Sequence, residues 1–326
     1  MPNRSGLKRI IPYVILFAGV AAAASAAIMI RLAQDLQVPS TTIAAGRLGI
    51  AALILLPIAL VRAHHELREV QRRDWILGGI SGTVLAIHFL AWISSLEYTS
   101  VASSVALVAT NPLWVAIASV TIFRERLTVA IALGVVLTIS GSVLIGISDS
   151  QGGGRNALFG NALALGGAIT ASIYFLIGRD MRRRLSTLAY IWIVYTSAAL
   201  VLIAVALSVG LNGTTNQAIV TNTTFFGLPF AAYTLLLGLA LGPQLLGHTA
   251  FNWSLRYLSA TFVAVAILGE PIGSAILALF LFSEGFAPLQ LAGFLVLLVG
   301  IAVALIGEQS RISKTKEASQ YAPAIE

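Results

Sequence analysis

Long apolar runs separated by short polar segments make up most of this sequence. Each run is close to the length of about 20 residues that a helix needs to cross the hydrocarbon core of a bilayer. Because backbone polar groups in lipid must bond within their own segment, such runs are predicted to be helices. Ten of them are predicted to span a membrane: residues 12–30, 41–61, 75–95, 99–121, 128–147, 158–178, 188–208, 227–247, 259–281 and 287–307.

The composition agrees with this pattern. Hydrophobic residues make up 58% of the chain and charged residues 10%, against about 25% charged residues in soluble domains. The first run is long and has no distinct cleavage site, so we expect it to stay attached. The predicted fold class is an all-α polytopic membrane protein that leaves no room for a soluble domain.

The basic residues predict the orientation. All of them fall on one side of the predicted spans except Arg31 and Arg155, which fall on the other, and Arg47, which lies within a span. The positive-inside rule then places both termini in the cytoplasm of a multi-pass protein of the cell (inner) membrane. The net charge of +7 is spread over short loops, so we expect no nucleic-acid partner.

The second half of the sequence repeats the first. Leu96, Tyr98, Ser100, Pro112, Phe123, Glu125, Gly134 and Gly141 recur at a constant spacing as Leu255, Tyr257, Ser259, Pro271, Phe282, Glu284, Gly293 and Gly300. The repeat divides the chain into five-helix units at 1–148 and 149–308, followed by a polar cytoplasmic tail at 309–326.

An odd number of helices in each unit inverts the second copy in the membrane. The loop charges follow this inversion, because the segment 124–126 carries two arginines whereas its counterpart 283–285 carries none. Inverted repeats are a recurring plan of secondary transporters, in which one unit rocks against the other. Glycines seven residues apart at 134 and 141, and at 293, 300 and 307, predict close helix contacts.

Two motifs carry a resemblance to a known family. Asn111-Pro112-Leu113 followed by Phe123 and Glu125, and Glu270-Pro271 followed by Phe282 and Glu284, resemble the paired EamA repeats of the drug/metabolite transporter superfamily. The resemblance covers roughly 12–307. It implies a ten-helix exporter of small metabolites, a group that includes exporters of amino acids, aromatic ones among them. It also implies a central path lined mainly by the first, third, fourth, sixth, eighth and ninth of the predicted spans. Both proton antiport and uncoupled facilitation occur in the wider group.

The two prolines predict breaks within apolar helices. Pro112 should open its helix near residue 108 and Pro271 near residue 267, because proline cannot donate the backbone hydrogen bond. Asn111 and Glu270 occupy equivalent positions beside these breaks. Two roles stay open for Glu270: it carries protons as the site alternates, or it bonds the opened backbone of a neighbouring helix. For Asn111 the choice is between substrate contact and inter-helix bonding.

Polar stripes mark two further helices. Gln244, His248 and Asn252 follow helical spacing on one, and His88, Trp92 and Ser95 on the other, so we expect both stripes to face a cavity. The histidines either bind a substrate carboxylate, pass a proton, or fix helix packing. The chain has no cysteine and no cluster of residues with metal-ligand spacing, so we expect no metal and no cofactor.

Aromatic residues add a further set of candidates. Trp92, Trp114 and Tyr174 either line the cavity, where they can stack on a planar or cationic substrate, or pack between helices. Trp192, Tyr195 and Trp253 are weaker candidates for the same role. Arg47 is expected to snorkel toward the membrane surface or to bond helix-end carbonyls, with the binding of an anionic substrate as the alternative.

The function predicted from the sequence is a secondary transporter, not an enzyme. It exports small organic metabolites, with amino acids or similar amphipathic compounds as the best guess, by alternating access at the two broken helices. Its partners are the small-molecule substrate and the lipid bilayer. The alternatives are an uncoupled facilitator of the same substrates and a membrane-embedded enzyme acting on lipid-linked substrates, which the scattered single polar residues argue against.

Overall fold

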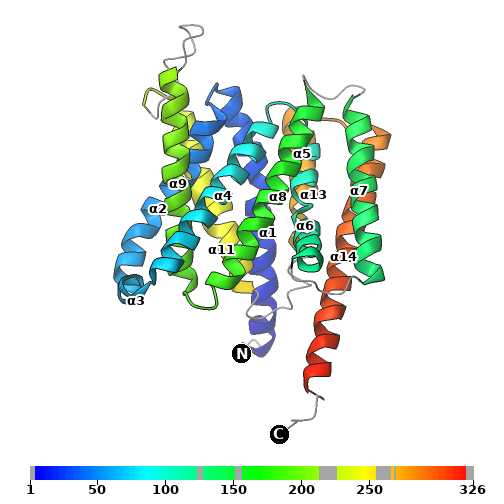
Figure 1. Ribbon diagram of the computed structural model, residues 1–326. Coiled ribbons are helices and arrows are strands. Elements are labelled where there is room, and N and C mark those ends of the chain that lie inside the picture. The colour runs from blue at the N-terminus through cyan, green and yellow to red at the C-terminus, as the bar shows by residue number, and fades with distance from the viewer. Residues whose placement is uncertain are drawn as a thin grey trace.

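A computed structural model describes residues 4–122, 128–150, 156–212, 226–254, 266–267 and 269–320. Every element within these ranges is a helix (Figure 1). The helices are α1 (Arg4–Asp35), α2 (Ser40–Arg62), α3 (His64–Glu69), α4 (Arg72–Ser95), α5 (Val101–Val108), α6 (Asn111–Thr121), α7 (Val129–Ser150), α8 (Ala157–Met181), α9 (Thr187–Asn212), α10 (Phe230–Leu239), the π-helix η2 (Ala240–Gly247), α11 (His248–Ser254), α13 (Gly269–Phe282) and α14 (Pro288–Gln320).

The helices include seven that are long and apolar enough to cross a membrane. These are Ile10–Asp35, Ser40–Arg62, Arg72–Ser95, Val129–Ser148, Ala157–Gly178, Thr187–Ser208 and Phe230–Phe251. The other three expected spans, at 99–121, 259–281 and 287–307, contain shorter apolar helices at Val101–Val115, Gly269–Phe282 and Pro288–Ala304. The all-helical, multi-pass membrane class is therefore confirmed, whereas the count of ten spans stays a prediction.

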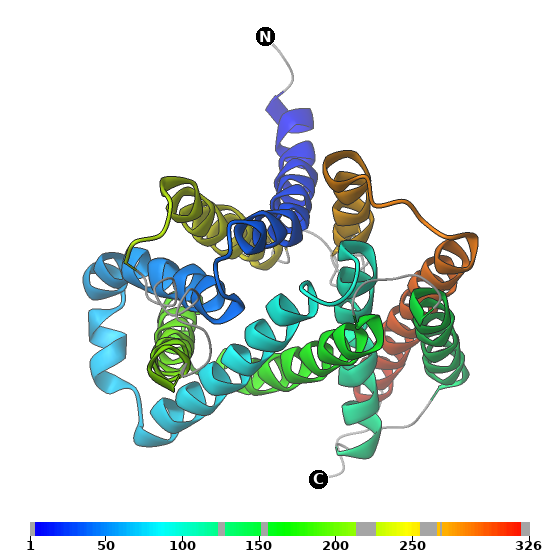
Figure 2. The same cartoon turned by 90° about the horizontal axis from the view of Figure 1, so that it is seen from above.

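The helices lie side by side, and the chain turns back at two opposite ends of the bundle. Helix α1 begins at the end of the bundle where α14 finishes, and α3 and the turn between α8 and α9 lie at that same end (Figure 1). We call this end the basic end, because Arg68, Arg72 and Arg182–Arg184 belong to it. Viewed along the bundle, α7 and α14 form one flank, and α2, α3 and α9 form the other (Figure 2).

Small residues bring α7 and α14 together. A Cβ atom added to Gly141 would lie 2.5 Å from the Leu297 backbone nitrogen, and one added to Gly300 would lie 2.6 Å from that of Thr138. Real Cβ atoms do not approach so closely, so only glycine fits at these positions. The close helix contact predicted from the seven-residue glycine spacing is confirmed.

Among the described residues, regular α-helix is interrupted at one predicted place and at one that was not predicted. The run 99–121 opens at residues 109–110, between α5 and α6, with Pro112 in the first turn of α6. This confirms the break expected near residue 108. The break expected near residue 267 borders on residues outside the described ranges. The other interruption is η2, a π-helical stretch that contains Pro243 in the run 227–247, where no irregularity was predicted. Proline removes a backbone donor, and π-bulges often accompany functional sites.

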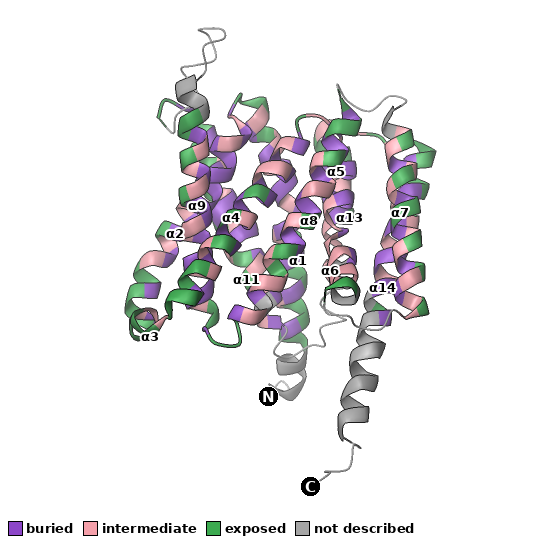
Figure 3. Cartoon of the chain, in the orientation of Figure 1, coloured by how far each residue is buried: buried purple, intermediate pink, exposed green. Residues whose placement is uncertain are grey.

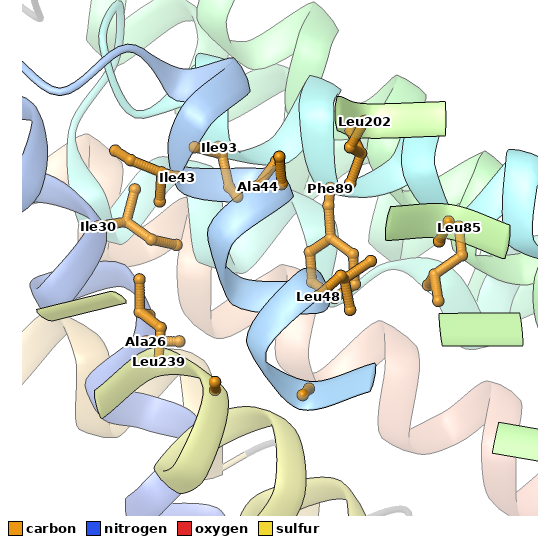
Figure 4. Packing of buried hydrophobic residues seen from close by; sticks show 14 of the residues in the cluster. Ala26, Ile30, Ile43, Ala44, Leu48, Leu85, Phe89, Ile93, Leu202 and Leu239 are labelled. Atoms are coloured by element: carbon orange, nitrogen blue, oxygen red, sulfur yellow. The ribbon is translucent and has the colours of Figure 1, made fainter. Parts of the chain in front are cut away.

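Apolar side chains fill the space between the helices and also cover the outside of the bundle. Buried residues of α1, α2, α4, α9 and α10 form the largest cluster, part of which is shown in Figure 4. Exposed residues lie mainly on the outer faces of the helices (Figure 3). Many of them are large and apolar, such as Leu53, Leu200 and Phe280. A surface of this kind suits contact with lipid.

Candidate functional site

A small cavity lies among the helices at the centre of the bundle. It encloses about 90 Å³, room for about three water molecules. The polar and aromatic side chains around it come from both halves of the chain: Arg47, His88, Phe89, Trp92, Asn111, Tyr174, Phe175, Tyr195, Gln244, His248 and Glu270. The family resemblance implied a path lined mainly by the first, third, fourth, sixth, eighth and ninth spans. The second and seventh spans, α2 and α9, also contribute residues to the lining.

A second cavity lies between this site and the basic end. It measures about 330 Å³. Tyr174, Phe175, Tyr195 and His248 line both cavities, and the far part of the second one is lined by Arg182, Arg183 and Thr187. We call the second cavity the vestibule. Since the two cavities share these walls, the vestibule adjoins the central cavity on the side of the basic end.

An ion network lies beside the vestibule. Arg184 donates hydrogen bonds to Asp74 Oδ1 at 2.8 Å and to Asp180 Oδ2 at 2.9 Å, which links the end of α8 to the start of α4. The hydrogen bond from Arg184 lowers the pKa of Asp180, and the hydrogen bonds to Asp180 and Asp74 raise the pKa of Arg184. The network holds the two helices together at the mouth of the vestibule.

The opposite end of the bundle is bridged by a polar network that we call the closing cluster, formed by Arg31, Gln34, Ser40, Glu97, Thr99 and Glu284. Arg31 Nη2 donates to the Thr99 carbonyl at 2.8 Å and lies 3.6 Å from Glu284 Oε1. Gln34 Nε2 donates to Ser40 Oγ at 2.9 Å and to the Ile93 carbonyl at 2.8 Å, and Ser40 donates to Glu97. The cluster therefore connects α1, α2, the α4–α5 turn and the segment before α14.

Glu284 lies between α13 and α14 but bonds a helix of the first half. Its Oε2 accepts a 3.0 Å hydrogen bond from the Val101 backbone N–H, at the start of α5. Partial burial raises the pKa of Glu284, and Arg31 and the Val101 N–H oppose that rise. The expected equivalent, Glu125, lies outside the described residues. Glu284 thus joins a segment of the second half to a helix of the first.

Arg47 does not snorkel. Its side chain is only 2% exposed and lies in the wall of the central cavity. Nε donates to Gln244 Oε1 at 2.8 Å, and the guanidinium carbon lies 4.4 Å from the centre of the Phe89 ring and 5.7 Å from that of Trp92. The expectation for Arg47 was wrong because an amide and two aromatic faces receive the guanidinium inside the bundle.

Both predicted histidines line the central cavity and also make packing contacts. His88 Nδ1 lies 2.8 Å from the Gly167 carbonyl. Since a carbonyl only accepts, Nδ1 carries the proton. The His88 ring is nearly parallel to that of Trp92, at 6.1 Å. His248 contacts the Phe251 ring edge to face at 6.0 Å and faces both the cavity and the vestibule.

The two residues beside the prolines also reach the cavity. Glu270 and Asn111 lie in its wall. The Asn111 carbonyl, close to the break between α5 and α6, accepts a 2.8 Å hydrogen bond from Ser172 Oγ, so a neighbouring helix satisfies this backbone group. Within the described part of the chain Glu270 forms no ion pair, although Arg47 acts on it electrostatically across the cavity.

The remaining candidates divide between the cavity and other places. Trp92, Tyr174 and Gln244 line it, whereas Trp114 is absent from the wall and donates from Nε1 to Thr110 Oγ1 at 3.1 Å. The Asn252 side chain lies outside what the structure describes. Sequence reasoning set Arg47 aside and gave Tyr195 little weight. The signal that was available is that Arg47 is the one basic residue within a predicted span.

Comparison with known proteins gives the family. A model of the EamA-like transporter family matches residues 10–147 and 158–306. The uncharacterized transporter YetK of Bacillus subtilis (strain 168) is 26% identical over 180 residues, which cover 54% of each chain, so this chain spans about half the length of that curated relative. A solved crystal structure covers 92% of this chain and 99% of its own at 17% identity, with a TM-score of 0.58, a likeness that shows the fold alone. Because the two family matches cover most of the sequence, the chain belongs to the EamA-like transporter family, and with it to the drug/metabolite transporter superfamily.

Proposed function

We propose that this protein is a secondary transporter that exports small amphipathic metabolites, amino acids first among them, by alternating access. One observation carries the proposal: the central cavity adjoins a vestibule toward the basic end, while the closing cluster bridges the opposite end. Among the described residues, the cavity thus has open space on one side and a bridged network on the other, as one half of a transport cycle requires. The other half of the cycle needs the closing cluster to open and the vestibule to close.

We further propose ten spans in two inverted units, 1–148 and 149–308. The packing supports this, because α1 contacts α13 and η2 as α8 contacts α5 and α4. The α7–α14 contact is reciprocal as well: Gly134 lies against Gly300 and Ala304, and Gly293 lies against Gly141 and Ile145. The sequence repeat pairs Gly134 with Gly293 and Gly141 with Gly300, so the two sets of contacts are made by equivalent residues of the two units.

We infer from the positive-inside rule that the basic end faces the cytoplasm and that the protein lies in the inner membrane. The vestibule then opens to the cytoplasm, where metabolites for export are made. Arg182 and Arg183 line that vestibule. Their charge would raise the local concentration of anionic groups at the mouth.

Glu270 is the proposed coupling residue. It is a carboxyl in the wall of a cavity that also holds Arg47, so the charge that it carries changes the field in which a substrate binds. In an antiporter, proton release and substrate binding would alternate at this carboxyl. In an uncoupled facilitator, Glu270 would serve only binding or packing.

The test is transport by the purified protein in liposomes with and without a pH gradient. Labelled leucine and phenylalanine are supplied to wild type, to Glu270→Gln, and to Glu69→Gln, which changes an exposed carboxyl at the basic end. Gradient-driven accumulation that Glu270→Gln abolishes and Glu69→Gln retains would support antiport. Equilibration that ignores the gradient in all three proteins would make the protein a facilitator, and no transport of either amino acid would overturn the proposed substrate.

A further inference from the structure

Two hydrogen-bond donors at the central cavity make no bond to the described part of the chain. They are Arg47 Nη1 and Trp92 Nε1, both in side chains that are less than 5% exposed and that line the cavity. Buried donors are nearly always satisfied. Two orphan donors in one cavity wall therefore point to an acceptor that arrives with a ligand.

The positive charge of Arg47 points to the same conclusion. Among the described residues no carboxylate lies within 4.0 Å of its guanidinium, and the one hydrogen bond that it makes goes to a neutral amide. Gln244 accepts from Nε and Phe89 covers one face, so the guanidinium is held in a fixed position while the buried Nη1 has no partner among the described residues. A buried cation held in this way is suited to a ligand that carries a negative charge.

We propose that Arg47 Nη1 and Trp92 Nε1 bind the carboxylate of the transported metabolite. A carboxylate only accepts hydrogen bonds and offers two oxygens, which matches two donors that have no other partner. The distance of 5.7 Å between the guanidinium carbon and the Trp92 ring centre keeps both donors near one small group. The proposal deepens the proposed function, on which it rests: substrates are carboxylates, and Glu270 in the same wall receives an ammonium group where the substrate has one.

The experiment measures binding directly, without transport. Full-length protein in lipid nanodiscs is titrated calorimetrically with phenylalanine, phenylalaninamide, 3-phenylpropionate and 2-phenylethylamine. We expect the two carboxylates to bind at least about tenfold more tightly than the amide and the amine, which lack the charged acceptor. Leucine and leucinamide repeat the comparison without an aromatic ring.

Variants assign the effect to the two donors. Arg47→Gln should weaken carboxylate binding by about 10- to 100-fold and bring the acid-to-amide ratio close to one. Trp92→Phe keeps a ring and removes only the N–H, and it should weaken carboxylates by about 3- to 10-fold. The matched controls are Arg62→Gln, at the end of α2, and Trp114→Phe, whose side chain is not in the cavity wall; both should bind like wild type.

Each outcome decides the proposal. Equal binding of acid and amide by wild type, failure of both carboxylates to bind, or an acid preference that survives both Arg47→Gln and Trp92→Phe would overturn it. If Arg47→Gln does not give a monodisperse protein, the carboxylate affinity of Trp92→Phe decides the proposal. Carboxylate binding with no transport in liposomes would reject the proposed function and keep the subsite, whereas transport that treats acid and amide alike would reject the subsite and keep the transporter.

Discussion

Arg47 Nε donates a 2.8 Å hydrogen bond to Gln244 Oε1, and this bond joins α2 in the first half of the chain to the π-helix in the second half. Both side chains are 2% exposed. A neutral partner holds the guanidinium without cancelling its charge, whereas a directly paired carboxylate would cancel it. The bond therefore fixes the position of the cation and leaves its charge available to a ligand.

Gln244→Glu tests whether the uncompensated charge of Arg47 is needed for ligand binding. The substitution places a carboxylate where the amide now accepts from Arg47, and the new ion pair competes with any ligand carboxylate. We expect the apparent melting temperature to rise or stay unchanged and the affinity for 3-phenylpropionate to fall by at least about tenfold, which corresponds to about 1.4 kcal/mol. Gln244→Leu is the control: it removes the hydrogen bond and adds no charge, so it should lower the melting temperature. Unchanged affinity in Gln244→Glu would contradict the role given to the Arg47 charge.

The closing cluster is expected to set how often its end of the bundle opens. Arg31→Gln removes the ion pair with Glu284 and weakens the bond to the Thr99 carbonyl, contacts that together hold α1 against the α4–α5 turn. A loss of about 1 kcal/mol would raise the open population about fivefold.

The chain has no cysteine, so a single reporter can be introduced. Thr42→Cys replaces a fully buried residue near the start of α2, and its labelling by a maleimide reports opening. Arg68→Gln, at the basic end, serves as the control and should leave the labelling rate unchanged. Equal rates in Arg31→Gln and in the parent protein would show that the cluster does not limit opening.

The pH dependence of this opening follows from Glu284. Partial burial raises the pKa of its carboxyl in the closed arrangement, despite Arg31 and the Val101 N–H. A carboxyl whose pKa is raised binds a proton more tightly when closed than when hydrated, so protonation favours closure. Closure is therefore strongest below the ordinary glutamate range near pH 4.3 and weakens as the pH rises through the raised pKa.

The measurement is Thr42→Cys labelling against pH, normalised to a free thiol. Labelling should accelerate as the pH rises through that window, and Glu284→Gln should flatten the profile. Glu97, the other carboxyl of the closing cluster, is tested in parallel by Glu97→Gln, which should keep the slope. A slope that persists in Glu284→Gln would assign the effect to another group.

The helices and much of the site followed from the sequence because each depends on local rules. Apolar runs of membrane length have few alternatives to helix, and the break before Pro112 follows from a missing backbone donor. Of the two polar stripes, His88, Trp92, Gln244 and His248 line the cavity, because helical spacing fixes the face on which a side chain lies. Ser95 instead bonds Ser104. These inferences needed no knowledge of which helices are neighbours.

The errors came from contacts between distant segments. Arg47 was assigned to the membrane surface because its neighbours in sequence offer no partner, whereas Gln244 and Phe89 become partners only when α2, α4 and η2 meet. Glu284 likewise has its partners, Arg31 and the Val101 N–H, on helices that are distant in the sequence. Trp114 is a different case: the sequence left it open between lining the cavity and packing, and its N–H bonds Thr110, one turn away on the same segment.

The α7–α14 contact allows a test that depends on packing alone. An alanine Cβ at position 141 would lie 2.5 Å from the Leu297 backbone nitrogen and 2.7 Å from the Gly293 carbonyl oxygen, so the helices must separate. Overpacking of this kind costs about 1–3 kcal/mol, and we expect Gly141→Ala to lower the apparent melting temperature by several degrees. Gly79→Ala is the matched control, since nothing lies within 4 Å of the added atom, and it should be neutral or slightly stabilising. Equal melting temperatures for the two variants would show that the two halves do not depend on this contact, and carboxylate binding should survive Gly141→Ala because neither helix lines the cavity.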